Sequence, residues 1–533
     1  MLEKILFAFY VTTSPILFLI RFTKNKTLAI VYRVMVKIKL VPVLLILYST
    51  NVMLSYIAWK ITEIKMIFPR LFGHKNYNKD YVEMHNKKIL GTDYHLAYIS
   101  DRLPAELVYK WRKDKVYHNY ISSIIRANLD YVNVVLDEFQ APTPISDDEL
   151  KNFIFSSQAS HYLQQQDGYL TFDMSSFHNE QVLPNISFDV RRFWISDNLN
   201  VDTMEIEMFD GARIKQGSRD WDLAKIYFLS NTMVFFIMGA HLHHHLFFAE
   251  MGAVSLFNRL KKGSNLYKLL SPHTAYTLML NDQFKNSPLS LRETPGIFDK
   301  FLYSCIGYYS PDTFYKVGYE NALNMYGKRD TLDESLTKQH RIRFDVPFNR
   351  YVTGSTTLNQ QLNAHYNTVR EFVSAIYDDL LLDEGIHDVN TWVSDVCHYV
   401  EIPVEKDASF NIDVIATYIW YVSFVHSMEH YQFYKLMKHY CLLTRTSFAK
   451  AAATRQAGGE VFSQYDLWKS KHIVLTFGKN HLNKGICESY ADIDYHFNSD
   501  LLRAQQDKFK LKVQTELVDF KVPAEAIALS IRY

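Results

Sequence analysis

The sequence is poor in cysteine, glycine and proline, and it has almost no excess charge. Its four cysteines, among 533 residues, are isolated and form no C-x-x-C motif, so we expect neither a disulfide framework nor a zinc ribbon. Glycine (18 residues) and proline (14 residues) are few, which argues against a fold rich in tight turns. Lysine and arginine (58) balance aspartate and glutamate (57), so charge gives no reason to expect nucleic-acid binding.

The chain is instead rich in apolar and aromatic residues. Hydrophobic residues make up 48% of it, including 36 Phe and 36 Tyr, which is enough to bury a large core in one very large domain or in two to four. Together with the shortage of turn residues, this composition predicts a mainly α-helical fold with aromatic-lined cavities.

The most informative segment is AKIYFLSNTMVFFIMGAHLHHHLFFAE, residues Ala224–Glu250. Its nearly uncharged run is too continuous for a surface helix and predicts a helix buried on all sides. Four histidines lie together near its end, at 241, 243, 244 and 245. An unpaired imidazole costs free energy in an apolar core, so this cluster indicates a function. His241 and His245 are four residues apart and project from the same helix face.

A second apolar segment, TYIWYVSFVHSMEHYQFYKL, carries His426 and His430 at the same spacing. A single buried histidine is more often a hydrogen-bonded structural residue, but two pairs on two buried helices can converge on one ion. The sequence therefore predicts one metal site built from His241, His245, His426 and His430.

The first 75 residues are unusually apolar. Ile5–Ile20 is uncharged, and Val41–Trp59 gives nineteen more residues without a charge, flanked by lysines. A run of this length just reaches across a hydrocarbon core of about 30 Å. We expect residues 1–75 to form apolar helices that anchor the protein to a membrane or, alternatively, pack on a catalytic domain of residues 76–533. The protein is accordingly expected to be membrane-associated or cytoplasmic, without a secretory signal peptide.

Local signals place smaller elements around the histidine helices. Ser146 and Glu149 form a predicted capping box for the helix that follows them. Two short strands are expected at about 192–195 and 203–209, two further helices at about 362–377 and 389–400, and the second histidine helix itself at about 412–437.

The order of these segments resembles the lipoxygenase family. The similarity covers roughly residues 168–533, and its most specific piece is LYKLLSPH between the two histidine helices. It runs through WDLAK (Trp221–Lys225), the first histidine helix, Glu250, Arg259, LYKLLSPH (Leu266–His273), HSMEH (His426–His430) and ALSIRY (Ala528–Tyr533). The resemblance implies a mainly α fold, a large helical domain around two buried histidine helices with small β-hairpin elements. The usual N-terminal β-sandwich is replaced by the apolar segments.

In that family a non-haem iron is held by two histidines of the first helix, by a histidine and a further side chain of the second, and by the carboxylate of the last residue. Carried over to this sequence, the resemblance implies the ligands His241, His245, His426, His430 and the main-chain carboxylate of Tyr533. It also implies iron, with manganese as the weaker alternative, and no catalytic side chain beyond the metal ligands.

Two departures from the family pattern concern this site. The family leaves four residues between its first two histidines, a spacing that needs a local π-bulge, whereas three residues separate His241 from His245. We expect a plain α-helix to bring these two together, with His244 as the alternative second ligand. The last residue is usually isoleucine and here is Tyr533, which keeps the carboxylate but adds a ring.

The resemblance implies an enzyme that inserts O₂ into polyunsaturated fatty acids or their lipid esters and releases hydroperoxides. Hydrogen abstraction from a weak bis-allylic C–H bond would precede O₂ addition, in an apolar channel that excludes water. Two alternatives stay open. The H-x-x-E-H pattern of His426–His430 also matches a zinc peptidase with Glu429 as general base. A lipoxygenase-like protein without turnover would only bind lipid or a membrane.

Overall fold

The computed structural model describes the chain from residue 141 onward, with gaps. The described residues are 141–175, 186–196, 203–237, 241, 245, 249–275, 277, 357–399, 404–405, 407–442, 444–463, 466–467, 470, 492–517 and 527–531. The expected anchor in residues 1–75, the alternative ligand His244 and the carboxylate of Tyr533 lie outside them. These three remain predictions.

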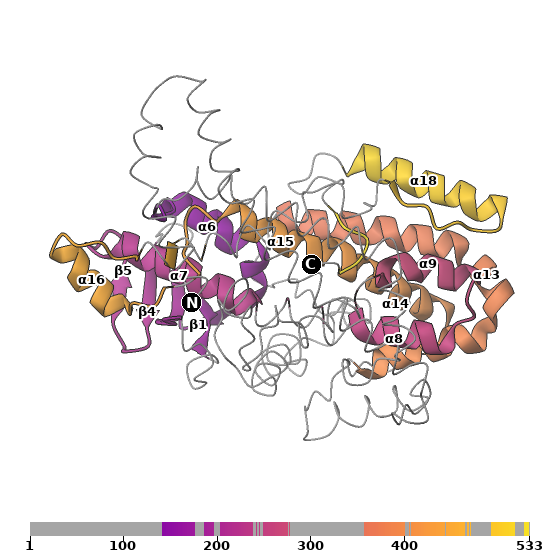
Figure 1. The fold of residues 1–533 in the computed structure, drawn as a ribbon, viewed down its shortest axis with the longest axis horizontal. Coiled ribbons are helices and arrows are strands. Elements are labelled where there is room, and N and C mark those ends of the chain that lie inside the picture. Colours follow the sequence, from indigo (N-terminus) through magenta and orange to yellow (C-terminus); the bar gives the residue numbers. More distant parts are fainter. Residues whose placement is uncertain are drawn as a thin grey trace, which may run out of the picture.

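A five-stranded antiparallel sheet forms one end of the molecule (Figure 1). Its strands lie side by side in chain order: β1 (Leu163–Gln166), β2 (Tyr169–Asp173), β3 (Val190–Ser196), β4 (Met204–Met208) and β5 (Arg213–Lys215). The strands predicted at 192–195 and 203–209 are β3 and β4. The structure adds three strands to this pair, so the expected hairpin is part of a larger meander.

Helix α6 (Asp147–Ser156) precedes the sheet and begins with the predicted capping box. The Ser146 hydroxyl accepts a hydrogen bond from the amide of Glu149, and the Glu149 carboxylate accepts one from the amide of Ser146, both at 3.2 Å. The short 3-10 segment η2 (Gln158–Tyr162) follows α6 and leads into β1.

Helix α7 (Trp221–Phe236) packs against the sheet. The ring of Phe228 stacks on Phe193 of β3 at 4.9 Å and meets Phe172 of β2 edge-on at 6.1 Å. Every residue of α7 except Asp222 is buried, which confirms the prediction of a helix buried on all sides.

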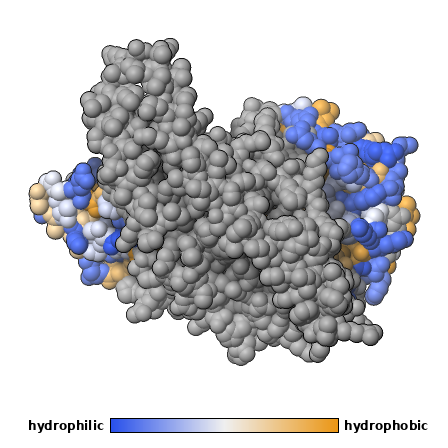
Figure 2. All heavy atoms as spheres, in the orientation of Figure 1, coloured by the Kyte–Doolittle hydropathy of each residue, from blue (hydrophilic) through white to orange (hydrophobic). Residues whose placement is uncertain are grey.

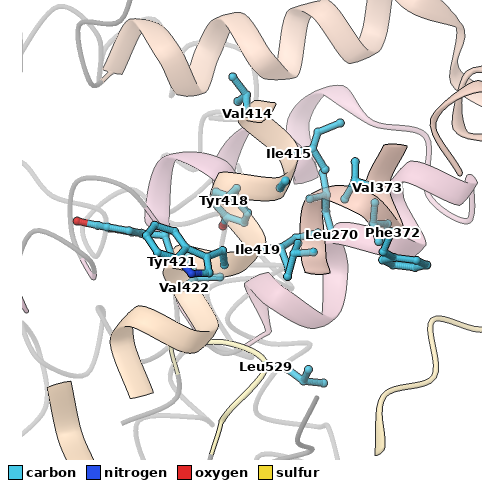
Figure 3. Packing of buried hydrophobic residues seen from close by; sticks show 14 of the residues in the cluster. Leu270, Phe372, Val373, Val414, Ile415, Tyr418, Ile419, Tyr421, Val422 and Leu529 are labelled. Atoms are coloured by element: carbon cyan, nitrogen blue, oxygen red, sulfur yellow. The ribbon is translucent and has the colours of Figure 1, made fainter. Parts of the chain in front are cut away.

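A helical core forms the other end of the molecule (Figure 1). Helix α13 (Thr357–Tyr399) packs there against four others: α8 (Glu250–Arg259), α9 (Asn265–Thr274), α14 (Ala408–Trp420) and α18 (Asp500–Glu516). Figure 3 shows Ile415 and Ile419 of α14 near Leu270 of α9 and Val373 of α13. Leu529 of the C-terminal tail belongs to the same buried cluster, so the end of the described chain is part of the core.

The prediction of two helices at 362–377 and 389–400 is confirmed: they are the two parts of α13, which extend into the interval between the predicted ranges and meet at a break at Gly385. Leu380 is fully buried in the core and keeps this interval packed against the other helices. A kink at Gly385 accommodates the change of direction, with φ 74° and ψ 157°, a backbone conformation that glycine adopts without strain.

The two histidine segments lie between these ends. α7 lies beside the sheet and α8 in the helical core, with the first pair between them in the chain, while α15 (His426–Lys435) continues from α14 toward the sheet end (Figure 1). Within the described residues, the helix Ala408–Lys435 is long and apolar enough to cross a membrane, but 83% of its most apolar window is buried inside the protein. Its burial is that of a core helix.

The surface over α18 and the end of α13 is predominantly hydrophilic, with scattered apolar residues (Figure 2). Leu501 and Leu511 of α18 and Leu382 and Ile386 of α13 are the large apolar side chains exposed on these two helices. Single exposed apolar residues are normal on a protein surface and indicate no binding face here.

Candidate metal centre

Four histidines come together in the interior, two from each apolar segment. Nε2 of His245 lies 3.0 Å from Nε2 of both His241 and His426, and Nε2 of His430 lies 3.2 Å from Nε2 of His426. One ring nitrogen from each histidine lies within 4.8 Å of the others, and all four residues are at most 3% exposed. The structure thus places His245 in the cluster, while His244 is outside the described residues.

The protonation of these rings suits a cation at their centre. A neutral imidazole has a single N–H. Nδ1 of His241 lies 3.2 Å from Oε2 of Glu429; an ionised carboxylate can only accept a hydrogen bond, so with Glu429 ionised Nδ1 carries the proton and Nε2 presents a lone pair to the cluster. Nε2 of His245 lies 3.0 Å from Nε2 of both His241 and His426, and one N–H on His245 cannot form a hydrogen bond to both. A cation at the centre would accept a lone pair from each of these nitrogens.

The distances between the nitrogens fit ligands of one metal ion. A metal–nitrogen bond of about 2.1 Å separates two nitrogens by about 3.0 Å at a right angle and by about 3.4 Å at the tetrahedral angle. The three contacts, at 3.0, 3.0 and 3.2 Å, fall within this range. The four imidazoles can therefore act as ligands of one metal ion.

Both histidine pairs adjoin π-helical backbone. The described residues between α7 and α8 are all π-helical: Ile237, His241, His245 and Ala249. On the second helix, the π-helical segment η7 (Tyr421–Val425) ends directly before His426. The expectation of a plain α-helix at the first pair was therefore wrong. The wider i→i+5 turn is present although the histidines are only four residues apart, and such turns are frequent at functional sites.

Glu429 contacts the cluster at Nδ1 of His241, on the side of the ring away from the other histidines. It is 1% exposed, its Oε2 accepts the Nδ1–H of His241 at 3.2 Å, and its Oε1 accepts a hydrogen bond from the side-chain amide of Gln158 in η2. Burial raises the pKa of Glu429, while the hydrogen bonds from His241 and Gln158 act in the opposite sense. Both carboxylate oxygens thus have partners, as a buried carboxyl group requires.

This position of Glu429 does not suit the peptidase interpretation. A general base must reach a water molecule bound to the metal, on the Nε2 side of the histidines. Glu429 instead contacts His241 on the Nδ1 side of the ring. This contact was not predicted from the sequence, and the available signal was an acidic residue between two histidines of a buried helix. Nothing in the sequence singled out Gln158.

The C-terminal tail docks on the second histidine helix. Residues 527–531 are buried, and the amide of Ala528 donates to the hydroxyl of Ser427 at 3.0 Å. Ser427 directly follows His426, so the tail lies next to the cluster. Tyr533, two residues beyond the last described one, is outside the description.

His273, the last residue of the LYKLLSPH segment, holds this tail in place. Its Nδ1 donates to the carbonyl of Leu529 at 2.7 Å, and its Nε2 accepts from the hydroxyl of Tyr495 at 2.9 Å. The hydroxyl of Ser530 donates to the carbonyl of Ala275, just after α9, at 2.7 Å. The sequence analysis had assigned no role to His273, which the structure shows to be a buried contact between α9 and the tail.

Comparisons with known proteins agree with this architecture. No protein-family model and no curated protein matches the sequence. Among solved structures, a coral 8R-lipoxygenase is similar with 14% identity and a TM-score of 0.56, over 86% of this chain and 81% of that one. The manganese lipoxygenase of Gaeumannomyces graminis matches with 12% identity and a TM-score of 0.57, over 82% and 92%. A lipoxygenase in complex with arachidonate matches with 13% identity and a TM-score of 0.55, over 86% and 82%.

These likenesses define the class of fold. The chain has the lipoxygenase fold, a large, mainly helical domain with a small antiparallel sheet, and the predicted fold class is confirmed. Its four-histidine cluster is one that can bind a metal ion.

Proposed function

We propose that the protein is a non-haem metal dioxygenase of the lipoxygenase type. The observation that carries the proposal is the convergence of four buried imidazole nitrogens within a lipoxygenase fold. His241, His245, His426 and His430 would hold the metal, and the main-chain carboxylate of Tyr533 would complete the set. Iron is proposed, with manganese as the alternative, since the fold is shared with a manganese lipoxygenase.

The proposed substrate is a polyunsaturated fatty acid or its lipid ester, with O₂ as the second substrate. A redox metal would supply the one-electron chemistry that takes a hydrogen atom from a bis-allylic C–H bond. Support for a fatty acid comes from the similar lipoxygenase structure that contains arachidonate. The product would be a hydroperoxide.

The contribution of the chain itself is a dry and ordered site. The ring of Phe433 is buried and lies 6.4 Å from the rings of both His241 and His430, where it shields the cluster from solvent. Exclusion of water protects a carbon radical from side reactions until O₂ adds to it.

We further propose that residues 1–75 attach the domain of residues 76–533 to a membrane. The support is the pair of uncharged runs Ile5–Ile20 and Val41–Trp59, the second of which has lysines on both sides. An anchored domain of this kind would meet its lipid substrates at the membrane surface.

Metal analysis and oxygen uptake on the purified full-length chain test the proposal together. We expect about one iron per chain, O₂ uptake with linoleate or arachidonate, and the absorbance of a conjugated-diene hydroperoxide. Bound zinc with peptide hydrolysis would instead establish the peptidase. Lipid binding with no O₂ uptake by the metal-loaded protein would identify a lipoxygenase-like protein that has lost turnover.

A further inference from the structure

Three segments far apart in the chain meet in one line of hydrogen bonds behind the cluster. The line runs from Gln158 in η2, through both oxygens of Glu429 in α15, to Nδ1 of His241. Gln158 and Glu429 are 271 residues apart, and His241 and Glu429 are 188 apart. All three residues are at most 3% exposed.

We infer that Glu429 is a positioning residue for His241, and that Gln158 positions Glu429 in turn. The inference rests on the proposed metal centre. A carboxylate that accepts the Nδ1–H of an imidazole fixes both the tautomer and the rotation of the ring. Here it leaves the Nε2 lone pair of His241 directed at the other three histidines, where a metal ligand must point.

A plain structural role does not explain a carboxyl group at this place. Residue 429 is enclosed within the protein, and an apolar side chain there would avoid the cost of taking a carboxylate out of water. Instead, each oxygen of this glutamate has a different partner: the side-chain amide of Gln158 for Oε1, and the ring of His241 for Oε2. Its hydrogen bond to His241 is directed along the ring, away from Nε2, so it supports the ligand without competing for the metal.

The test measures metal affinity, without substrate or O₂. Full-length protein is loaded anaerobically with Fe²⁺, and its dissociation constant is determined by competition with a chelator. We expect Glu429→Ala to weaken Fe²⁺ binding about 10- to 100-fold, the usual effect of removing such a partner. Glu429→Gln keeps an oxygen that can accept from Nδ1–H, so it should restore most of the affinity lost in Glu429→Ala.

Two further variants make the result specific. Gln158→Ala keeps the carboxyl group of Glu429 but removes the hydrogen bond to its Oε1. This variant should weaken Fe²⁺ binding less than Glu429→Ala does. Glu207→Gln is the matched control, because Glu207 is a buried carboxylate in β4 that accepts hydrogen bonds from Trp194 at 2.9 Å and Arg191 at 3.3 Å, both in β3 and outside the cluster. It should leave the Fe²⁺ dissociation constant unchanged.

A spectroscopic readout separates positioning from general loss of structure. In Co²⁺-substituted protein, Glu429→Ala should shift the visible absorption bands, whereas Glu207→Gln should not. Wild-type affinity and an unshifted spectrum in Glu429→Ala would overturn the inference, as would equal losses in Glu429→Gln and Glu429→Ala. If Glu429→Ala does not fold, Gln158→Ala decides, and unchanged affinity there overturns it. A wild-type chain that binds no Fe²⁺ would instead refute the proposed metal centre itself.

Discussion

The ring of Tyr418 occupies the space that a side chain on residue 252 would need. A Cβ placed on Gly252 would come within 2.1 Å of that ring. The Tyr418 hydroxyl donates to the carbonyl of Ala249 at 2.8 Å, and the indole N–H of Trp392 donates to the carbonyl of Gly252 at 3.1 Å. Helix α8 continues the first histidine segment and α14 precedes the second, so the missing side chain lets the two histidine segments approach each other.

Gly252→Ala should therefore destabilise the protein. The added methyl group forces the Tyr418 ring out of its place in a packed core, at a cost of about 1–3 kcal/mol in the free energy of unfolding. Urea unfolding of the full-length chain measures this cost. Tyr418→Leu removes the ring, so the double variant should be more stable than the sum of the single effects predicts. Strict additivity would show that the contact does not limit the approach of the helices.

Removal of one histidine from either pair should remove the metal. We expect His241→Ala and His426→Ala to purify with little iron, because each loses a ligand from a buried set. His387→Ala is the control, since His387 lies exposed on α13 and should keep the wild-type metal content. Elemental analysis of the purified, folded variants gives the answer. Full metal content in both cluster variants would refute the centre.

The end of the chain should tolerate a new side chain but not an extension. Tyr533→Ile keeps the main-chain carboxylate at the same point and should retain metal and activity. A C-terminal tag displaces that carboxylate and should abolish both, because the preceding residues 527–531 are buried and hydrogen-bonded. Metal content and O₂ uptake are measured on tagged, untagged and tag-cleaved protein. Equal turnover by tagged and untagged chains would rule out the fifth ligand.

His365 should make the protein less stable in mild acid. Burial lowers its pKa from 6.5 to about 3, and its ring stacks on Phe424 at 3.8 Å. As the pH falls below 6.5, the unfolded state binds a proton that the native state does not, so stability falls with it. At pH 5 the loss is about 2 kcal/mol.

Replacement of His365 by phenylalanine tests this effect. His365→Phe should lose less stability between pH 8 and pH 5 than the wild type, by about the same 2 kcal/mol, because no proton is taken up on unfolding. Chemical denaturation at the two pH values measures the difference. An identical pH dependence in both proteins would show that His365 is not the group responsible.

Deletion of residues 1–60 should release the protein from membranes. The deletion removes the uncharged runs Ile5–Ile20 and Val41–Trp59, which form the proposed membrane anchor. Flotation with liposomes compares the full-length and truncated chains, and O₂ uptake shows whether the remaining domain is active. A full-length chain that fails to float with liposomes would exclude the anchor.

The parts of this structure that could be predicted from sequence are those set by local spacing. Histidines four residues apart in an uncharged helix share a face wherever that helix lies, and the Ser146–Glu149 box depends on a single turn. Strand β1 could not be found this way, since three of its four residues are exposed glutamines and only pairing with β2 makes it a strand.

The remaining features of the site depend on tertiary contacts. The π-helical turns at the histidines follow no residue type that the sequence analysis could use. The hydrogen bond between Glu429 and His241 links positions 188 apart. The five-residue pattern H-x-x-E-H gave Glu429 a role only in the alternative peptidase interpretation, as a general base, and does not predict its contact with His241.

The separation of these contacts along the chain also sets the order in which the site can form. His245 is synthesised 181 residues before His426, and Ser427 is synthesised 101 residues before Ala528. Closing loops of this length has an entropic cost that must be met before the contacts form, so non-local contacts form late in folding. The nascent chain therefore exposes its first pair of imidazoles long before the second pair exists. We therefore expect the metal to bind a nearly folded apoprotein, because all four imidazoles come together only late in folding.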